Sequence, residues 1–141
     1  MTSTVDGRPR LIIADDNAAI RSALSMSLDR AFEIVGVAAD CEQAVELART
    51  SQPAGALVDV DMPKGGGLCA VRGIVEVSPD TAIVMLSGDE SDGVVRELIQ
   101  AGAMAYARKG TGPQVLTELI TKSIKGHAAE APLSLLTARR P

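Results

Sequence analysis

Aromatic side chains are almost absent from this chain of 141 residues, which contains one phenylalanine, one tyrosine and no tryptophan. The interior therefore has to be built from Val, Ile, Leu and Ala, which suits helices packed against a parallel β-sheet. Long apolar runs are missing as well, and none approaches the roughly 18 residues of a membrane-spanning helix. Residues 1–9 contain no apolar segment typical of a signal peptide.

Cysteine is scarce, and the two that occur, Cys41 and Cys69, have the spacing of neither a metal site nor a redox pair. We expect both to be free thiols that act as small apolar residues. The formal net charge is −4, which is the wrong sign for a protein that binds the phosphate backbone of nucleic acids. Together these features predict a cytoplasmic protein that binds neither nucleic acid nor membrane.

Short apolar runs alternate with segments of helical periodicity along most of the chain. Runs such as Leu11–Ala14 and Ala82–Leu86 have the length and β-branched content of buried strands. Between the runs, apolar residues recur at helical spacing, as at Ile20, Leu24 and Leu28. About five strand–helix repeats with short connections predict a three-layer α/β domain, in which helices cover both faces of a parallel sheet.

The alternation stops near Gly126. Gly126 and Pro132 interrupt the pattern, so we expect residues 126–141 to form a linker-like C-terminal tail. The residues after Pro132 are too few for another domain. At the other end, residues 1–9 are expected to be flexible.

Polar residues follow the predicted strands at the point where each strand ends. In an open parallel α/β sheet, functional groups gather outside the carboxyl ends of the strands, so these side chains are expected to meet at one edge. They are Asp15 and Asp16 after the first strand, Asp59 and Asp61 after the third, Ser87 and Asp89 after the fourth, and Lys109 after the fifth.

Several carboxylates at one edge have a chemical consequence. Two carboxylates 4 Å apart repel by roughly 4 kcal/mol at an effective dielectric constant near 20. Such a cluster either holds protons at a raised pKa or binds a divalent cation, and oxygen ligands favour Mg²⁺, Mn²⁺ or Ca²⁺. A lysine and a serine beside it supply the positive charge and the hydrogen-bond donor that a transferred phosphoryl group requires.

Each of these residues also has a purely structural interpretation. Asp15 and Asp16 alone could cap the following helix and place an acid in its first turn. Ser87 alone could be a hydroxyl at a strand end, and Lys109 alone could be solvated. Their coincidence at the ends of strands along one edge favours a functional site over these alternatives.

In their order and spacing, these residues resemble the receiver domain of two-component response regulators over residues 10–125. The match includes the acidic pair, Asp59 followed by Met62–Pro63, then a serine and a lysine at later strand ends. Ala101–Gly102–Ala103 before Tyr106 is similar to the family's approach to that lysine. The resemblance implies a flavodoxin-like three-layer sandwich with a five-stranded parallel sheet in the order 2-1-3-4-5.

The resemblance also implies roles. Asp59 would accept a phosphoryl group from a sensor histidine kinase or a phosphotransfer protein, and Ser87 and Lys109 would contact that group. Mg²⁺, with Mn²⁺ as a substitute, would be held by Asp15, Asp16 and Asp59 together with the backbone carbonyl of Asp61. The protein would be no enzyme in the ordinary sense, because it would catalyse only its own phosphorylation and dephosphorylation.

By the same resemblance, Ser87 and Tyr106 would form a switch that changes the surface presented to a downstream protein partner. Packing of Tyr106 in the core is the competing interpretation. Asp61 and Asp89 occupy positions that modulate the family's dephosphorylation rate. A homodimer is left open.

Three further features of the sequence bear on function. Gly110 follows the lysine where most receivers have proline, which is common in receivers of LuxR/NarL-type regulators and predicts a more flexible loop. Leu136–Arg139 resembles the start of a LuxR-type helix-turn-helix, so the receiver portion of a longer LuxR-type transcriptional regulator is one alternative. Gly65–Gly67 is expected to loosen the loop beside the site.

Two further alternatives compete with the receiver interpretation. Asp59 and Asp61 also fit the Asp-x-Asp pair of haloacid-dehalogenase-type phosphatases, which form an aspartyl phosphate. In those enzymes this pair precedes the other motifs, whereas here Asp15 and Asp16 come first. The remaining alternative is a receiver-like module that only docks partners.

Overall fold

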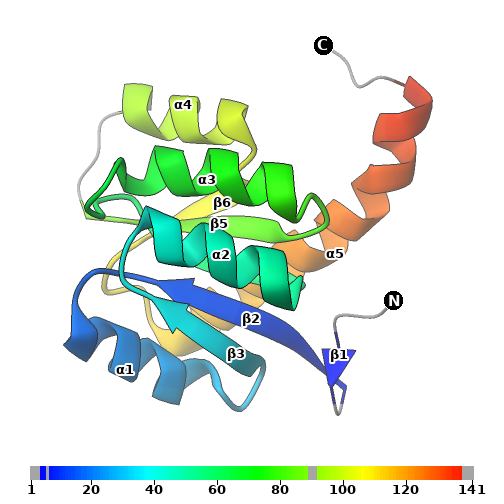
Figure 1. Ribbon diagram of the computed structural model, residues 1–141. Coiled ribbons are helices and arrows are strands. Elements are labelled where there is room, and N and C mark those ends of the chain that lie inside the picture. Colours follow the sequence, from blue (N-terminus) through cyan, green and yellow to red (C-terminus); the bar gives the residue numbers. More distant parts are fainter. Residues whose placement is uncertain (1–3, 6, 89–91, 138–141) are drawn as a thin grey trace.

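The computed structural model describes residues 4–5, 7–88 and 92–137. Strands and helices alternate along it as the sequence pattern predicts (Figure 1). The elements are β1 (Thr4–Val5), β2 (Arg8–Ala14), α1 (Ala18–Leu28), β3 (Glu33–Ala38), α2 (Cys41–Ser51), β4 (Gly55–Asp59), α3 (Gly66–Val77), β5 (Ala82–Ser87), α4 (Asp92–Ala101), β6 (Ala105–Arg108) and α5 (Pro113–Thr137).

Five parallel strands form the sheet in the spatial order β3-β2-β4-β5-β6. Numbered along the chain as parallel strands only, this is the order 2-1-3-4-5, so the predicted flavodoxin-like topology is confirmed. The strand order changes direction at the centre of the sheet, because β3 lies on one side of β2 whereas β4, β5 and β6 follow on the other. The carboxyl ends of β2 and β4 therefore adjoin each other at one edge.

A short antiparallel hairpin precedes the first parallel strand. Thr4 pairs with Pro9 and Val5 with Arg8, and Gly7 takes a positive φ of 77° between them. The described part of this segment is thus paired with β2, and the expectation that residues 1–9 are flexible stays a prediction. Glycine permits the tight reversal because it has no Cβ to clash in that conformation.

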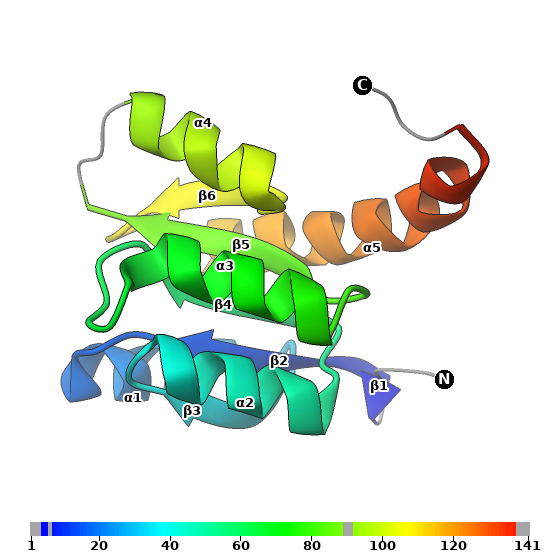
Figure 2. The same cartoon turned by 45° about the horizontal axis from the view of Figure 1, so that its top comes forward.

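Helices cover both faces of the sheet, and each face has its own apolar core (Figures 1 and 2). On one face, α2, α3 and α4 pack over Ile12, Val58 and Met85. On the other, α1 and α5 pack over Leu11, Leu57 and neighbouring residues. Both cores are almost wholly aliphatic, as the composition predicts, and Phe32 is the one aromatic side chain among their buried members.

Helix α5 continues through Thr137, so residues 126–137 of the predicted linker-like tail at residues 126–141 are helical, and the rest of that tail lies outside the described residues. The helix continues across Gly126 and Pro132, the two residues that suggested a break, and the alanines and glutamate between them are strong helix formers. The Nε2 atom of His127 donates a hydrogen bond to the backbone carbonyl of Pro79 at 2.8 Å, which attaches this part of α5 to the α3–β5 turn. The domain limit at residue 125 stays a prediction.

Cys41 and Cys69 are joined by a disulfide, so the prediction of two free thiols is wrong. The sequence hid this pair because 28 positions separate the two residues. Cys41 is the first residue of α2, and Cys69 lies in the first turn of α3. The two helices lie side by side in both views, which brings the cysteines together (Figures 1 and 2).

Among the described residues, no helix combines the length and the apolar composition needed to span a lipid bilayer.

Candidate functional site

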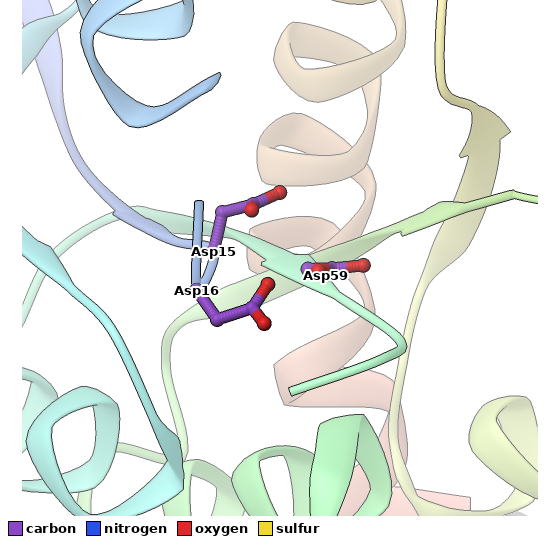
Figure 3. A group of neighbouring side chains, drawn as sticks. All are labelled: Asp15, Asp16 and Asp59. Carbon is purple, nitrogen blue, oxygen red and sulfur yellow. The ribbon is translucent and has the colours of Figure 1, made fainter. Parts of the chain in front are cut away.

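Three carboxylates converge at the carboxyl edge of the sheet, as the sequence predicts (Figure 3). Asp15 and Asp16 follow the end of β2, and Asp59 is the last residue of β4, the neighbouring strand. One oxygen from each carboxylate lies within 4.8 Å of the other two. We call these three residues the acidic edge.

Backbone hydrogen bonds beyond the ends of the strands fix the residues of this edge. The amide of Asp15 donates to the carbonyl of Ala38 at 3.0 Å, and the amide of Val60 donates to Leu86 at 2.9 Å. The amide of Lys109 likewise donates to the carbonyl of Ser87 at 2.8 Å. Because the sheet continues through these bonds, the functional side chains project from a rigid frame.

Asp15 is fully buried, with 0% of its surface exposed. Its Oδ1 accepts a hydrogen bond from the amide of Asn17 at 2.9 Å, and its Oδ2 has no hydrogen-bond partner among the described residues. Asn17, and not an aspartate, caps α1 by accepting from the amide of Ile20. The alternative that Asp15 and Asp16 cap this helix is therefore wrong. Asp16 is exposed beside the buried pair.

Asp59 is also buried, with 1% exposure. Its Oδ1 accepts from the amide of Asp61 at 3.1 Å and lies 3.1 Å from Nζ of Lys109, whereas Oδ2 has no hydrogen-bond partner in the described chain. Burial raises the pKa of Asp59, and the charge of Asp15 raises it further. The hydrogen bond from Asp61 and the contact with Lys109 offset only part of this increase.

Lys109 pairs with both buried carboxylates, because its Nζ also lies 3.7 Å from Oδ2 of Asp15. Burial lowers the pKa of Lys109, but the hydrogen bond and charge of Asp59, with the charges of Asp15 and Asp16, outweigh burial and raise it. The side chain is therefore a permanent cation at neutral pH. The alternative of a merely solvated lysine is wrong.

The donor set fits a divalent cation. Three carboxylates face one ammonium group, so the site carries excess negative charge. Two buried oxygens, Oδ2 of Asp15 and Oδ2 of Asp59, lack hydrogen bonds, and such atoms are costly unless a cation or a donor satisfies them. Carboxylate oxygens of this kind are the preferred ligands of hard divalent ions.

Ser87 is the last residue of β5 and is buried next to β4. Asp61 follows β4 and is exposed, and its backbone amide turns back to Asp59. Asp89, predicted to modulate the dephosphorylation rate, lies outside the described residues.

Tyr106 is 48% exposed, so the interpretation that it packs in the core is wrong for this structure. Its neighbour Ala107 is buried in the core beneath α1 and α5. Because successive strand residues point to opposite faces, Tyr106 projects toward the face that α4 covers.

Sequence reasoning missed two residues that position Asp15. Asn17 donates its amide to the Asp15 carboxylate, and Arg21 donates from its guanidinium to the Asp15 backbone carbonyl at 2.8 Å. An asparagine directly before a helix is a recognisable cap signal. The contact of Arg21 depends on the arrangement of α1 and carries no such signal.

Gly65–Gly67 was expected to loosen the adjoining loop, and the structure assigns these glycines a geometric role. Gly65 and Gly66 have positive φ values of 102° and 71°. A Cβ on Gly67 would lie 2.8 Å from Cα of Val60. Glycine is therefore needed for the turn and for the close approach of α3 to β4.

A family model described as the response regulator receiver domain matches residues 11–121. The chain belongs to the response regulator receiver family. Among curated relatives, it is 32% identical to the response regulator GacA of Pseudomonas aeruginosa over 126 residues, a match that covers 87% of this chain and 58% of that protein. The chain thus spans little more than half the length of this relative.

Solved structures agree on the fold. The receiver domain of the response regulator AraT from Geobacillus stearothermophilus is 30% identical, with a TM-score of 0.75, and the match covers 86% of this chain and 97% of that one. The receiver domain of the putative response regulator NarL from Mycobacterium tuberculosis has a TM-score of 0.80 at 23% identity, covering 84% and 98%. Receivers of NarL/LuxR-type regulators are thus among the neighbours of this chain, as its sequence predicts.

Proposed function

We propose that Asp59 accepts a phosphoryl group from a phosphohistidine on a sensor histidine kinase or a phosphotransfer protein. The observation that carries the proposal is the position of Asp59 at the end of β4, with Lys109 at 3.1 Å and the carboxylates of Asp15 and Asp16 within 4.8 Å. A small donor such as acetyl phosphate serves as well, because the groups that promote transfer belong to the receiver.

In this reaction a carboxylate oxygen of Asp59 attacks phosphorus in line with the bond to the donor. An oxygen–phosphorus bond forms while the bond from phosphorus to the histidine nitrogen breaks, and the product is an aspartyl phosphate. Lys109 pairs with the phosphoryl oxygens, and the Ser87 hydroxyl donates a hydrogen bond to one of them. No other substrate is turned over.

Mg²⁺, or Mn²⁺ in its place, would be held by the carboxylates of Asp15, Asp16 and Asp59 and by the backbone carbonyl of Asp61. The bound cation supplies positive charge that neutralises the phosphoryl oxygens. The buried oxygens of Asp15 and Asp59 that lack hydrogen bonds support this assignment, since a cation would satisfy both. Lys109 prevents the two buried carboxylates from being wholly uncompensated before the cation binds.

Phosphorylation of Asp59 changes the surface that the receiver presents to a downstream protein. Ser87 moves toward the phosphoryl group, and Tyr106 turns inward from its exposed position to fill the space left behind. The surface of α4 and β6 then presents a different shape to a downstream protein. Asp61 and Asp89 set how long the phosphoryl group persists.

The test is an intact-mass measurement after incubation with acetyl phosphate and Mg²⁺. We expect one phosphate on the wild-type chain, none on Asp59→Asn, and one on the matched control Asp61→Asn. A phosphate adduct that persists on Asp59→Asn would show that Asp59 is not the acceptor. If the wild type gains no phosphate from acetyl phosphate or from a phosphorylated kinase, the alternative of a module that only docks partners would hold.

A longer LuxR-type transcriptional regulator is the second candidate for the natural context of this receiver. The observation that favours it is coverage, since the match spans 58% of GacA from Pseudomonas aeruginosa and 54% of UvrY from Escherichia coli. In that context phosphorylation of Asp59 would control a DNA-binding segment outside the receiver domain. A gel-shift measurement on the chain alone is expected to show no retarded DNA, with or without acetyl phosphate.

The phosphatase alternative makes a different prediction. An aspartyl-phosphate phosphatase releases many equivalents of phosphate from small phosphate esters, whereas a receiver releases only the phosphate that it has taken up. Sustained release from p-nitrophenyl phosphate would therefore contradict the receiver mechanism.

A further inference from the structure

The disulfide between Cys41 and Cys69 lies at the same edge of the sheet as the acidic edge, where β3 leads into α2 and β4 leads into α3. It joins the first residue of α2 to the first turn of α3, with 6.0 Å between the two Cα atoms. Helix α3 is reached from Asp59 through residues 60–65, which we call the β4–α3 loop. The bond therefore attaches the far end of this loop to the neighbouring helix.

Three further contacts hold the same loop. The amide of Gly67 donates to the carbonyl of Val60 at 2.7 Å. Nζ of Lys64 lies 3.6 Å from Oδ2 of Asp40 and 3.6 Å from Oε1 of Glu42, at the start of α2. Lys64 is exposed, so these ion pairs contribute little by themselves. The covalent link acts on the loop through Cys69, in the first turn of α3, and is the strongest connection between this region and α2 among the described residues.

We propose that the Cys41–Cys69 disulfide is a reversible redox modification that sets how firmly the β4–α3 loop is held beside Asp59. In the oxidised state the loop is anchored at both ends and the site is preorganised. In the reduced state the loop opens more often, so the acidic edge binds a divalent cation less tightly and Asp59 is phosphorylated more slowly. This last consequence rests on the proposed function.

The two sulfur atoms differ in access. Cys69 is exposed, whereas Cys41 has 4% of its surface exposed. The disulfide borders an open surface depression, whose lining residues are Cys41, Glu42, Val45, Glu46, Lys64 and Cys69. An incoming thiolate can therefore reach the sulfur of Cys69.

Attack on Cys69 breaks the disulfide with Cys41 as the leaving group. The released thiolate lies at the N-terminus of α2, where the helix dipole favours negative charge. With a dithiol reductant, two electrons and two protons pass to the cysteines, and the reductant ends as its own disulfide. In the reverse direction, a small disulfide such as glutathione disulfide accepts the two electrons from the cysteine pair.

The packing of α2 against α3 does not depend on the disulfide. A Cβ on Gly73 of α3 would lie 2.4 Å from Cγ2 of Val45, so the two helices are in close contact well beyond the cysteines. Ala44 and Ala70 are fully buried in the core between the helices and the sheet. Reduction is therefore expected to leave the fold intact and to act locally on the loop.

The first experiment measures the redox state of the cysteines and the amide exchange of the loop, without any phosphorylation. The chain is equilibrated with glutathione disulfide or with dithiothreitol, and alkylation followed by intact mass counts the thiols. We expect none in the oxidised chain and two in the reduced chain. Amide hydrogen exchange across residues 60–68 should then be roughly tenfold faster in the reduced chain, whereas the amides of α5 that exchange by local opening should be unchanged. Two thiols after oxidation, or equal exchange in both states, would overturn the proposal.

The second experiment measures function in both redox states. The rate of phosphorylation by acetyl phosphate and the Mg²⁺ concentration for half-maximal rate are compared for three proteins. The wild type should lose rate on reduction, Cys69→Ser should match the reduced wild type under both conditions, and Arg72→Ala should respond to reduction like the wild type. Arg72 is exposed one turn further along α3, so it is a matched control for a surface substitution.

The outcomes separate the two proposals. If no state of the wild type gains phosphate but exchange in the loop still depends on reduction, the proposed function fails and the redox modification stands. If the wild type is phosphorylated at the same rate in both states, the redox control is overturned and the proposed function stands.

Discussion

At the acidic edge, charged groups are buried, whereas on the surface formed by α4 and β6, apolar groups are exposed. Asp15 and Asp59 have 0% and 1% of their surface exposed, while Ile99 and Tyr106 have 41% and 48%. Both arrangements are unfavourable when isolated, since buried charge lacks solvation and exposed apolar surface orders water. Each region thus carries an unfavourable free-energy term that its own residues do not remove.

The acidic edge and the surface of α4 and β6 are connected through neighbouring strands. Ser87 ends β5, and its carbonyl accepts from the amide of Lys109, which follows β6, the strand that carries Tyr106. A charge added at the acidic edge can therefore reposition the end of β5 and β6 together. The comparison indicates that a divalent cation would compensate the buried charge of the first region, and that a phosphoryl group held there with it would alter the second.

Removal of the Lys109 side chain should produce the largest effect, a slower phosphorylation at the acidic edge. Lys109→Ala eliminates the cation that lies 3.1 Å from Asp59 and 3.7 Å from Asp15, so we expect phosphorylation by acetyl phosphate to slow by about 10²–10³-fold. Initial rates from intact mass would check this. Lys122→Ala, an exposed lysine on α5, is the control and should retain the wild-type rate. A comparable loss in both variants would contradict the role of Lys109.

Reduction of the disulfide should lower the stability of the whole domain while leaving α4 and β6 unchanged in structure. Opening a covalent loop whose ends are 28 positions apart is expected to cost about 2–4 kcal/mol in unfolding free energy. Urea titrations with and without dithiothreitol, followed by circular dichroism, would measure the difference. The variant Cys41→Ser/Cys69→Ser should show no response to reductant, and a response there would point to an effect unrelated to the disulfide.

Removal of the Asp59 charge should stabilise the metal-free protein at neutral pH. Burial raises the pKa of Asp59 in the folded state, so its protonated form contributes stability below the unfolded pKa. That contribution is lost as the pH rises through the raised folded pKa. Asp59→Asn should therefore melt at a higher temperature than the wild type at pH 7, and the difference should disappear in acid.

Thermal melts at several pH values, with Asp61→Asn as the control, would test this sign. Asp61 is exposed, so its substitution should leave the melting temperature nearly unchanged. A lower melting temperature for Asp59→Asn at pH 7 would show that the ion pair with Lys109 outweighs the cost of burial.

The smallest effect is expected at Tyr106. It is the only tyrosine in a chain without tryptophan, so tyrosine fluorescence reports this one side chain. Phosphorylation should change the emission and its quenching by iodide as Tyr106 leaves solvent. Tyr106→Ala should be phosphorylated at the wild-type rate, because the groups that contact Asp15 and Asp59 in the described chain are Asn17, Asp61 and Lys109. Unchanged quenching in a fully phosphorylated sample would remove Tyr106 from the switch.

The residues of the acidic edge could be predicted because their positions follow from one rule. The strands were recognisable from apolar runs, and parallel strands place their carboxyl ends at one edge, so Asp15, Asp59 and Lys109 had to meet. The order of the sheet came from the family resemblance, and the structure confirms it. Neither step required knowledge of side-chain packing.

What the sequence could not supply depends on packing between elements. The pairing of Cys41 with Cys69 requires the register of α2 against α3, which no local pattern records. The continuation of α5 past Gly126 depends partly on the contact of His127 with the α3–β5 turn. The exposure of Tyr106 depends on the packing around β6, which the strand pattern alone does not record.

The most direct test of the account is to locate the phosphoryl group chemically on the wild-type chain. Borohydride reduces an aspartyl phosphate to homoserine, and peptide mass spectrometry then identifies the altered position. The account predicts homoserine at position 59 after incubation with acetyl phosphate and Mg²⁺, and none when Mg²⁺ is omitted. Homoserine at position 15, 16 or 61 instead would contradict the assignment of Asp59 as the acceptor.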